Sequence, residues 1–160
     1  MDELTIKIHW KGVYSLDEVN KREDGNGLYL LAGKRKYKQE DSDIQYFGIT
    51  EKKYKERFSD KNHPIHDITR DLKIWLGEVI YPQNFELKHL KTAEAIMIYY
   101  WQPNLNTQNK PYPPRPTTIV SHWFKKDGSP RINQVYKNLH DVMSWDGEYW
   151  RTGNLSVYQE

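Results

Sequence analysis

The sequence predicts an α+β fold followed by a C-terminal appendage that is rich in strands and aromatic residues. Two strand-like segments, 27–33 and 44–50, are joined by a polar loop, so an antiparallel hairpin is the economical connection. The strongest helical pattern covers 89–101 and is stopped by Pro103. A proline-rich stretch at 111–116 then separates this body from a segment of different texture.

Local patterns predict the other elements of the body. Residues 4–10 alternate apolar and polar side chains, which predicts an edge strand. Thr50 is a suitable cap for a helix that runs to about Phe58. A second short helix is expected over 64–71, because a proline at its first position has a favourable backbone angle. Residues 72–81 are expected to form a third strand.

The C-terminal segment is predicted to be a small β-rich appendage. Residues 117–124 are strand-like, and an Asp-Gly pair at 146–147 lies between 142–145 and 148–151, which is a strong hairpin signal. Its aromatic residues either stack on nucleic-acid bases or, by the favoured interpretation, mostly form its core or pack against the body. The expected boundaries are 1–110 for the body, 111–116 for the connector and 117–160 for the appendage.

Composition limits the classes of protein that fit this chain. Its 160 residues suffice for one domain with a small appendage, and an aromatic content of 14% provides for a buried core. The absence of Cys excludes disulfides, thiolate catalysis and zinc held by Cys. No apolar run reaches the roughly 18 residues of a membrane span, and 1–8 is too polar for a signal peptide. A cytoplasmic protein without membrane contact is expected.

Two tyrosines of the predicted hairpin are brought together by its symmetry. Tyr29 and Tyr46 lie at nearly equal distances from the middle of the loop near Tyr37 and Lys38. Antiparallel pairing is therefore expected to place them directly opposite each other or one step apart. Taken alone, such a pair is most simply a cross-strand aromatic contact.

One carboxylate falls on the apolar face of the predicted helix. Leu90, Met97, Ile98 and Trp101 repeat at helical spacing, and Glu94 lies among them. A carboxylate among core positions is costly unless it is paired or binds a metal ion. Either Glu94 is a ligand for a hard cation, or the helical phase differs slightly and the side chain reaches solvent.

Taken together, these segments resemble the GIY-YIG nuclease family. The two signatures correspond to 27–29 (Gly-Leu-Tyr) and 46–50 (Tyr-Phe-Gly-Ile-Thr), followed by Arg57, Glu94 and 103–106 (Pro-Asn-Leu-Asn). The resemblance spans about half of the chain, in the order that is typical of the family. It implies a small antiparallel three-stranded sheet flanked by helices, and a hydrolase that cleaves phosphodiester bonds.

The chain departs from the family pattern at a few positions. Leu28 replaces the usual isoleucine and Phe47 replaces isoleucine or valine, which keeps both positions apolar, and Arg57 comes one residue later than in the shortest members. The family often has a histidine one turn after the arginine, where this chain has Lys61. The resemblance therefore points to His63 as a substitute.

The resemblance also implies roles for the matched residues. Glu94 is implied to be the sole direct protein ligand of one Mg²⁺ or Mn²⁺ ion, which keeps several waters and binds substrate phosphate. Arg57 is implied to stabilise the developing phosphate charge. Tyr29 is the candidate general base or water-positioning group, and Tyr46 orients water or phosphate beside it. Asn106 is expected to hold the site together.

Clusters of basic residues are candidate contacts for nucleic acid. The net charge of +2 and the pI of about 8.6 are only mildly basic, so local charge is more informative than the total. Such clusters are either solvated surface or phosphate-facing surface. The candidate nucleic-acid-binding residues are Lys34, Arg35, Lys36, Lys53, Lys61, Lys125, Lys126 and Arg131.

The expected function is that of a metal-dependent DNA endonuclease, restriction-like or from a mobile element, of bacterial or phage origin. Double-stranded DNA is the expected partner, and cutting both strands requires either a homodimer or sequential nicking. The alternative is a nucleic-acid-binding module that kept the fold and lost cleavage. A third hypothesis is a β-rich interaction protein with accidental motif matches, which requires Glu94 to face solvent and Tyr29 to lie far from Arg57.

Overall fold

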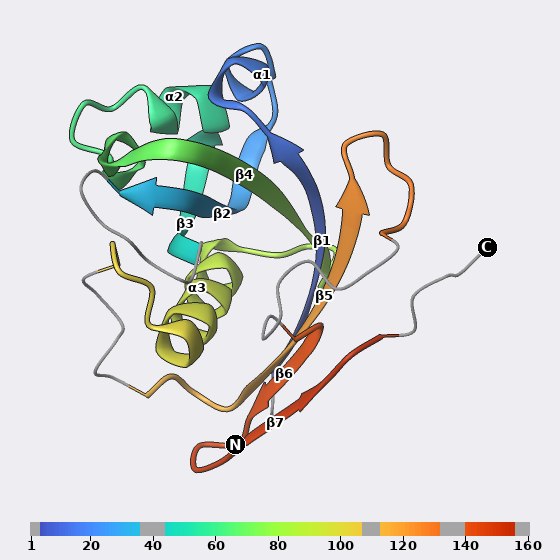
Figure 1. Cartoon of the computed structure of the whole chain (residues 1–160). Coiled ribbons are helices and arrows are strands. Elements are labelled where there is room, and N and C mark those ends of the chain that lie inside the picture. The colour runs from blue at the N-terminus through green and yellow to red at the C-terminus, as the bar shows by residue number, and fades with distance from the viewer. Residues whose placement is uncertain (1–3, 36–43, 107–112, 132–139, 156–160) are drawn as a thin grey trace.

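A seven-stranded mixed sheet runs through the molecule in the order β3-β2-β4-β1-β5-β6-β7 (Figure 1). The computed structural model describes residues 4–35, 44–106, 113–131 and 140–155. The strands are β1 Leu4–Tyr14, β2 Gly25–Arg35, β3 Ile44–Lys53, β4 Ile68–Tyr81, β5 Thr117–Lys125, β6 Val142–Trp145 and β7 Trp150–Gly153. The helices are α1 Leu16–Asn20, α2 Tyr54–Phe58, α3 Leu87–Trp101 and the 3₁₀ helix η1 Pro64–Asp67.

The prediction of a small three-stranded sheet flanked by helices was wrong. The three strands expected in the body are present and adjacent, as β3, β2 and β4, but they form only one end of the sheet. β1 pairs antiparallel with β4 and parallel with β5, and this parallel pairing carries the sheet into the C-terminal segment. The appendage strands therefore extend the sheet of the body.

The expectation that 4–10 forms an edge strand was also wrong, because β1 has a neighbour on each side. The alternation of apolar and polar residues that suggested an edge has a different origin. Ile6, Ile8 and Trp10 are fully buried, whereas Lys7 and Lys11 point to the opposite, solvated face. Alternation of apolar and polar residues indicates that one face of the sheet is exposed, and a central strand can have an exposed face as well as an edge strand.

Helices cover the two faces of the sheet unequally (Figure 1). On one face, α3 packs against a core that includes Trp10, Leu30 and Trp123. On the other face, α1, α2 and η1 lie over the end formed by β3, β2 and β4, around a second core that includes Tyr29 and Phe58. The site described below lies where this second core reaches the edge strand β3.

The helix predictions had mixed outcomes. The helix expected over 89–101 is confirmed as α3, which ends where Gln102 adopts a left-handed conformation before Pro103. Thr50 does not cap α2: the helix begins at Tyr54 with Lys53 as its N-cap, and the Thr50 hydroxyl bonds the backbone of Lys52 within β3. The helix expected over 64–71 is the shorter 3₁₀ helix η1, which ends at Asp67, and β4 begins at the next residue, Ile68.

Two of the strands predicted for the C-terminal segment are confirmed, and the third is displaced. β5 covers the expected 117–124, and β6 covers the expected 142–145. β7 forms the expected antiparallel hairpin with β6 around Asp146 and Gly147, but it begins at Trp150 instead of residue 148. Part of the predicted connector, 111–112, lies outside the described residues, and the proposed boundaries stay a prediction. Among the described residues, no helix has the length and apolar character required to cross a membrane.

Candidate active site

Tyr29 on β2 and Tyr46 on β3 lie on the same face of the sheet, with ring centroids 5.9 Å apart. The expected direct or one-step pairing was wrong, because Tyr29 is opposite Gly48 and Tyr46 is opposite Leu31. The pairing shifts register between Leu31 and Ala32, so equal distances from the loop do not give opposite positions. The two phenols are therefore diagonal neighbours.

Two glycines of the matched signatures make room for aromatic side chains. A Cβ at Gly48 would collide with the ring of Tyr29, so only glycine allows that ring to lie over β3. A Cβ at Gly27 would collide with the Tyr54 hydroxyl, which donates to the carbonyls of Leu28 and Gly77. Both glycines are thus explained by close packing around the tyrosines.

His63 fixes the hydroxyl of Tyr29. Its Nε2 lies 2.7 Å from the Tyr29 hydroxyl, and its Nδ1 accepts a hydrogen bond from the backbone of Ile65 at 3.0 Å. Burial lowers the pKa of His63 to about 4, with Arg57 adding to the shift, so the ring is neutral near pH 7. Because Nδ1 accepts, Nε2 carries the proton and donates it to Tyr29.

The two phenols differ in their access to solvent. Tyr29 has no exposed surface, whereas Tyr46 is only half-buried. Burial raises the pKa of Tyr29 and, to a smaller extent, that of Tyr46. Arg57 on α2 opposes the shift at both tyrosines, and its side chain also lies 3.8 Å from Asp60. Of the two, Tyr46 is therefore the phenol that can meet a ligand.

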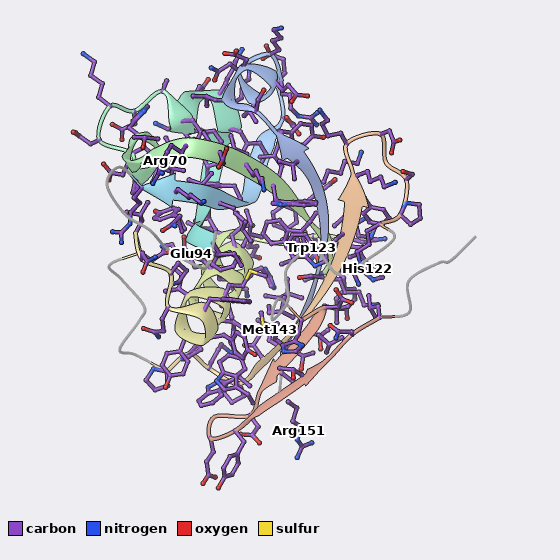
Figure 2. All side chains as sticks on the ribbon, viewed as in Figure 1. Arg70, Glu94, His122, Trp123, Met143 and Arg151 are labelled. Carbon is purple, nitrogen blue, oxygen red and sulfur yellow. The ribbon has the colours of Figure 1, made fainter. Side chains whose placement is uncertain are left out.

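Glu94 projects from α3 toward the edge strand β3 (Figure 2). Its side chain is half-buried, and burial raises the pKa of the carboxyl to about 7. Arg57, Lys91 and hydrogen bonding from the backbone of Ile49 act in the opposite direction, and the effect of burial is larger. No Lys or Arg in the described part of the chain forms an ion pair with Glu94 within 4.0 Å.

Asn106 ties the segment after α3 to the outer edge of β3. Its Oδ1 accepts from the Phe47 amide at 3.0 Å, and its Nδ2 donates to the Phe47 carbonyl at 2.9 Å. The amide of Leu105 bonds the carbonyl of Gln45 on the same strand. The buried Asn106 side chain therefore replaces a missing neighbour strand beside Tyr46 and holds this edge in place.

The donor set at the site fits a hard divalent cation that keeps most of its waters. Within the described ranges, no group of three or more His, Cys, Asp or Glu side chains is arranged to hold a metal ion. Mg²⁺ does not require such a group, because it commonly binds one or two carboxylates and several waters. Burial disfavours the ionised carboxylate of Glu94. A cation bound beside Glu94 would stabilise the ionised carboxylate.

The hypothesis of accidental motif matches makes two requirements that the geometry does not meet. It requires Glu94 to face solvent, but the side chain is half-buried and interacts with the Ile49 backbone. It also requires Tyr29 to lie far from Arg57, but the guanidinium is near enough to influence the pKa of Tyr29. The matched residues converge in space from β2, β3, α2, α3 and the turn at His63.

Most of the predicted nucleic-acid contacts are spread over separate surfaces, and three of them are engaged with acidic residues. Lys53 pairs with Glu23 at 2.6 Å, Lys126 pairs with Glu18 at 2.9 Å, and Arg131 pairs with the buried Asp141. The others are Lys34 and Arg35 at the end of β2, the exposed Lys61 and Lys125, and Lys36, which lies outside the described residues.

Sequence reasoning missed two aromatic residues that shape the site. Phe58 packs edge-on against Tyr29 with centroids 4.8 Å apart, and Tyr54 does so at 6.4 Å. Their spacing of one helical turn was visible in the sequence, but it indicated only an apolar helix face. In the appendage, Trp123 and Trp145 belong to the core, as the favoured interpretation held, while Tyr149 is exposed and Tyr158 lies outside the described residues.

Comparison with known protein families, with curated proteins and with solved structures finds no match to this chain.

Proposed function

We propose that this protein is a metal-dependent nuclease that hydrolyses phosphodiester bonds in DNA. The observation that carries the proposal is the convergence of Tyr29, Tyr46, Arg57 and His63 on one side of β3, with Glu94 approaching the same strand from α3. A half-buried phenol, a guanidinium and a carboxyl that forms no ion pair within 4.0 Å among the described residues are a combination suited to a phosphate ester.

The hydrogen-bond directions give each tyrosine a distinct task. His63 donates to the Tyr29 oxygen, which leaves the Tyr29 proton to be donated toward Tyr46. The Tyr46 oxygen also interacts with Arg57, so its own proton is available to a ligand. Tyr46 is therefore proposed to contact the attacking water or the phosphate. Tyr29, which has no exposed surface, is proposed to position Tyr46, and not to serve as the general base or water-positioning group that the resemblance implies.

Arg57 and Glu94 are proposed to manage charge at the phosphate. The guanidinium of Arg57 can bond two phosphate oxygens as negative charge develops on them. Glu94 would hold one Mg²⁺ or Mn²⁺ ion, which when bound supplies Lewis-acid stabilisation of the phosphate and of the leaving oxygen. Double-stranded DNA as substrate, action as a homodimer or by sequential nicking, and a cytoplasmic location remain predictions that accompany this proposal.

Cleavage of supercoiled plasmid in Mg²⁺, in Mn²⁺ and in EDTA tests the proposal. Wild type should nick or linearise the plasmid only with a metal ion, and Glu94→Ala should lose at least about a thousandfold in rate because the metal ligand is gone. Glu148→Gln, which alters an exposed carboxylate in the turn between β6 and β7, should cleave like wild type.

The same experiment separates the enzyme from the non-catalytic alternative. DNA binding in a gel-shift assay should be largely retained by Glu94→Ala. Retained binding with no cleavage by the wild type under any metal condition would favour a binding module without catalysis. Cleavage by Glu94→Ala at the wild-type rate would remove Glu94 from the site.

A further inference from the structure

The face of β1 and β5 that points away from α3 carries a cluster of aromatic rings. His9 and His122 are register partners in the parallel pairing, and their ring centroids lie 5.4 Å apart. Phe124 lies 5.0 Å from His9 and is nearly parallel to His122. All three side chains are half-buried, and no described helix covers this face (Figure 1). Figure 2 shows His122 and Trp123 on opposite sides of β5.

A cavity of about 360 Å³ adjoins this cluster, at the boundary where the layer of α1 and α2 ends. His9, Lys11 and Glu78 line it from the open face of the sheet. The opposite wall includes Tyr54, whose ring packs edge-on against Tyr29 with centroids 6.4 Å apart. One aromatic ring therefore separates the cavity from the buried tyrosine of the candidate active site.

The charges of the cavity and of its approach differ. Within the cavity, Arg22 forms a bidentate pair with Asp24, while Lys11 and Glu78 add one charge of each sign to the lining without forming an ion pair with each other. The cavity lining is thus close to neutral while rich in donors and acceptors. Along β1 outside the cavity, the exposed Lys7 adds a positive charge on the same face. A neutral polar ring would suit the cavity, and a phosphate chain would suit the strand beside it.

A metal ion is a weaker interpretation of the same residues. His9 is opposite Glu78 on β4 and His122 on β5, so two imidazoles and one carboxylate lie in a row across the sheet. No such set in the described part of the chain has its side chains close enough together to hold a metal ion. Half-exposed rings flanked by lysines are the arrangement found where proteins stack single-stranded bases.

We propose that this face binds an unpaired, single-stranded segment of nucleic acid, with bases stacked on His9, His122 and Phe124 and one base seated in the adjoining cavity. The inference rests on the proposed nuclease function, because it assigns a second contact to the same substrate. Lys7 and Lys11 neutralise phosphates of the strand. The partner it selects is DNA that is locally open, such as a branch, a flap or a flipped base.

Fluorescence anisotropy with a labelled single-stranded DNA of about 12 nucleotides tests the inference. The measurements use Glu94→Gln as background, in EDTA, so that no cleavage occurs. His122→Ala removes a stacking ring and should weaken binding at least about fivefold. Lys11→Gln replaces an exposed side chain. It should reduce the number of counterions released on binding, measured as the slope of log affinity against log salt concentration, by about one.

Two controls make the result specific to this face. Lys88→Gln removes an equally exposed lysine from α3, on the other side of the sheet, and should leave binding within about twofold of the background protein. A fully paired duplex of the same sequence should bind His122→Ala as well as it binds the background protein. Thermal melting verifies that each variant is folded.

The outcomes separate this inference from the nuclease proposal. If His122→Ala and Lys11→Gln both bind the single strand like Lys88→Gln, the inference is wrong, whatever the plasmid assay shows. If His122→Ala weakens duplex binding as much as single-strand binding, the face is a general DNA surface and the inference is also wrong. Selective loss of single-strand binding supports the inference even if plasmid cleavage is absent.

Discussion

The two ends of the sheet differ in how they are covered. At the end formed by β3, β2 and β4, helices lie on both faces, and the side chains of Leu28, Tyr29 and Leu30 are all fully buried. At the end formed by β5, β6 and β7, the side of Trp123 and Met143 is buried, and the residues that alternate with them are half-exposed. Both faces are therefore covered at one end of the sheet, and only one face is covered at the other.

This difference in coverage teaches how burial sets the charge state of side chains in one sheet. Burial on both faces shifts pKa values: that of His63 falls to about 4 and that of Glu94 rises to about 7, so each is biased toward its neutral form. The open end instead contains an ion pair, in which Arg131 donates to the buried Asp141 at 2.7 Å. Its outer face remains accessible.

The largest expected contrast between the two ends concerns phenol hydroxyls. Tyr46→Phe at the covered end should slow single-turnover cleavage about 10²- to 10⁴-fold, because the hydroxyl proposed to contact the attacking water or the phosphate is removed. Tyr149→Phe, at an exposed phenol of the open end, should cleave at the wild-type rate. Quench-flow measurements with saturating enzyme provide both rates. Equal rates for the two variants would remove Tyr46 from the chemistry.

A smaller contrast is expected from two glycines. Gly48→Ala places a methyl group against the ring of Tyr29 and should cost about 1–3 kcal/mol of stability through overpacking. Gly153→Ala in β7 meets no atom within 4 Å and should change stability by less than about 0.5 kcal/mol. Urea denaturation measures both. If the two substitutions cost the same, close packing at Gly48 is not what requires glycine there.

The smallest contrast concerns Glu94 and pH. Because burial raises its pKa to about 7, the folded protein binds this proton more tightly than the unfolded chain does. The resulting stabilisation is complete below the ordinary value near 4.5 and is lost as the pH rises through about 7. Glu94→Gln stays neutral, so without metal it should exceed wild type by about 1–2 kcal/mol near pH 8 and match it near pH 4.

Thermal melting in EDTA across this pH range measures the effect. Glu148→Gln, at an exposed carboxylate of the open end, should follow the wild-type curve throughout. A difference between Glu94→Gln and wild type that stays constant with pH would show that burial does not disfavour the Glu94 charge.

Much of the local structure was predictable from the sequence, while the sheet as a whole was not. Periodicity identified the helix around Glu94, and turn residues identified the hairpin at Asp146 and Gly147. The parallel pairing of β1 with β5 has no such signal, because it joins segments more than 100 positions apart, as in the bond from Trp10 to Ser121. Local pattern does not specify which distant strand becomes a neighbour.

For the candidate site, the sequence indicated residue types and order, but not their arrangement. The register of Tyr29 and Tyr46 depends on a shift in the β2–β3 strand pairing near Ala32, which no residue pattern in the sequence predicts. Tyr29 is buried because Phe58 and His63 pack over its ring, and both come from segments that follow β3 in the chain. The direction of the His63 hydrogen bond depends on the Ile65 amide, which is a backbone feature. These properties arise from tertiary packing.

The central place of β1 also has a consequence for the order of assembly. β1 leaves the ribosome well before β4 and β5, yet it needs both to satisfy its two edges. A nascent chain that has not reached Lys125 therefore holds β1 with one row of backbone groups unpaired, and such edges invite pairing with other chains. High contact order of this kind slows folding, so synthesis at low temperature with abundant chaperones should raise the yield of native protein.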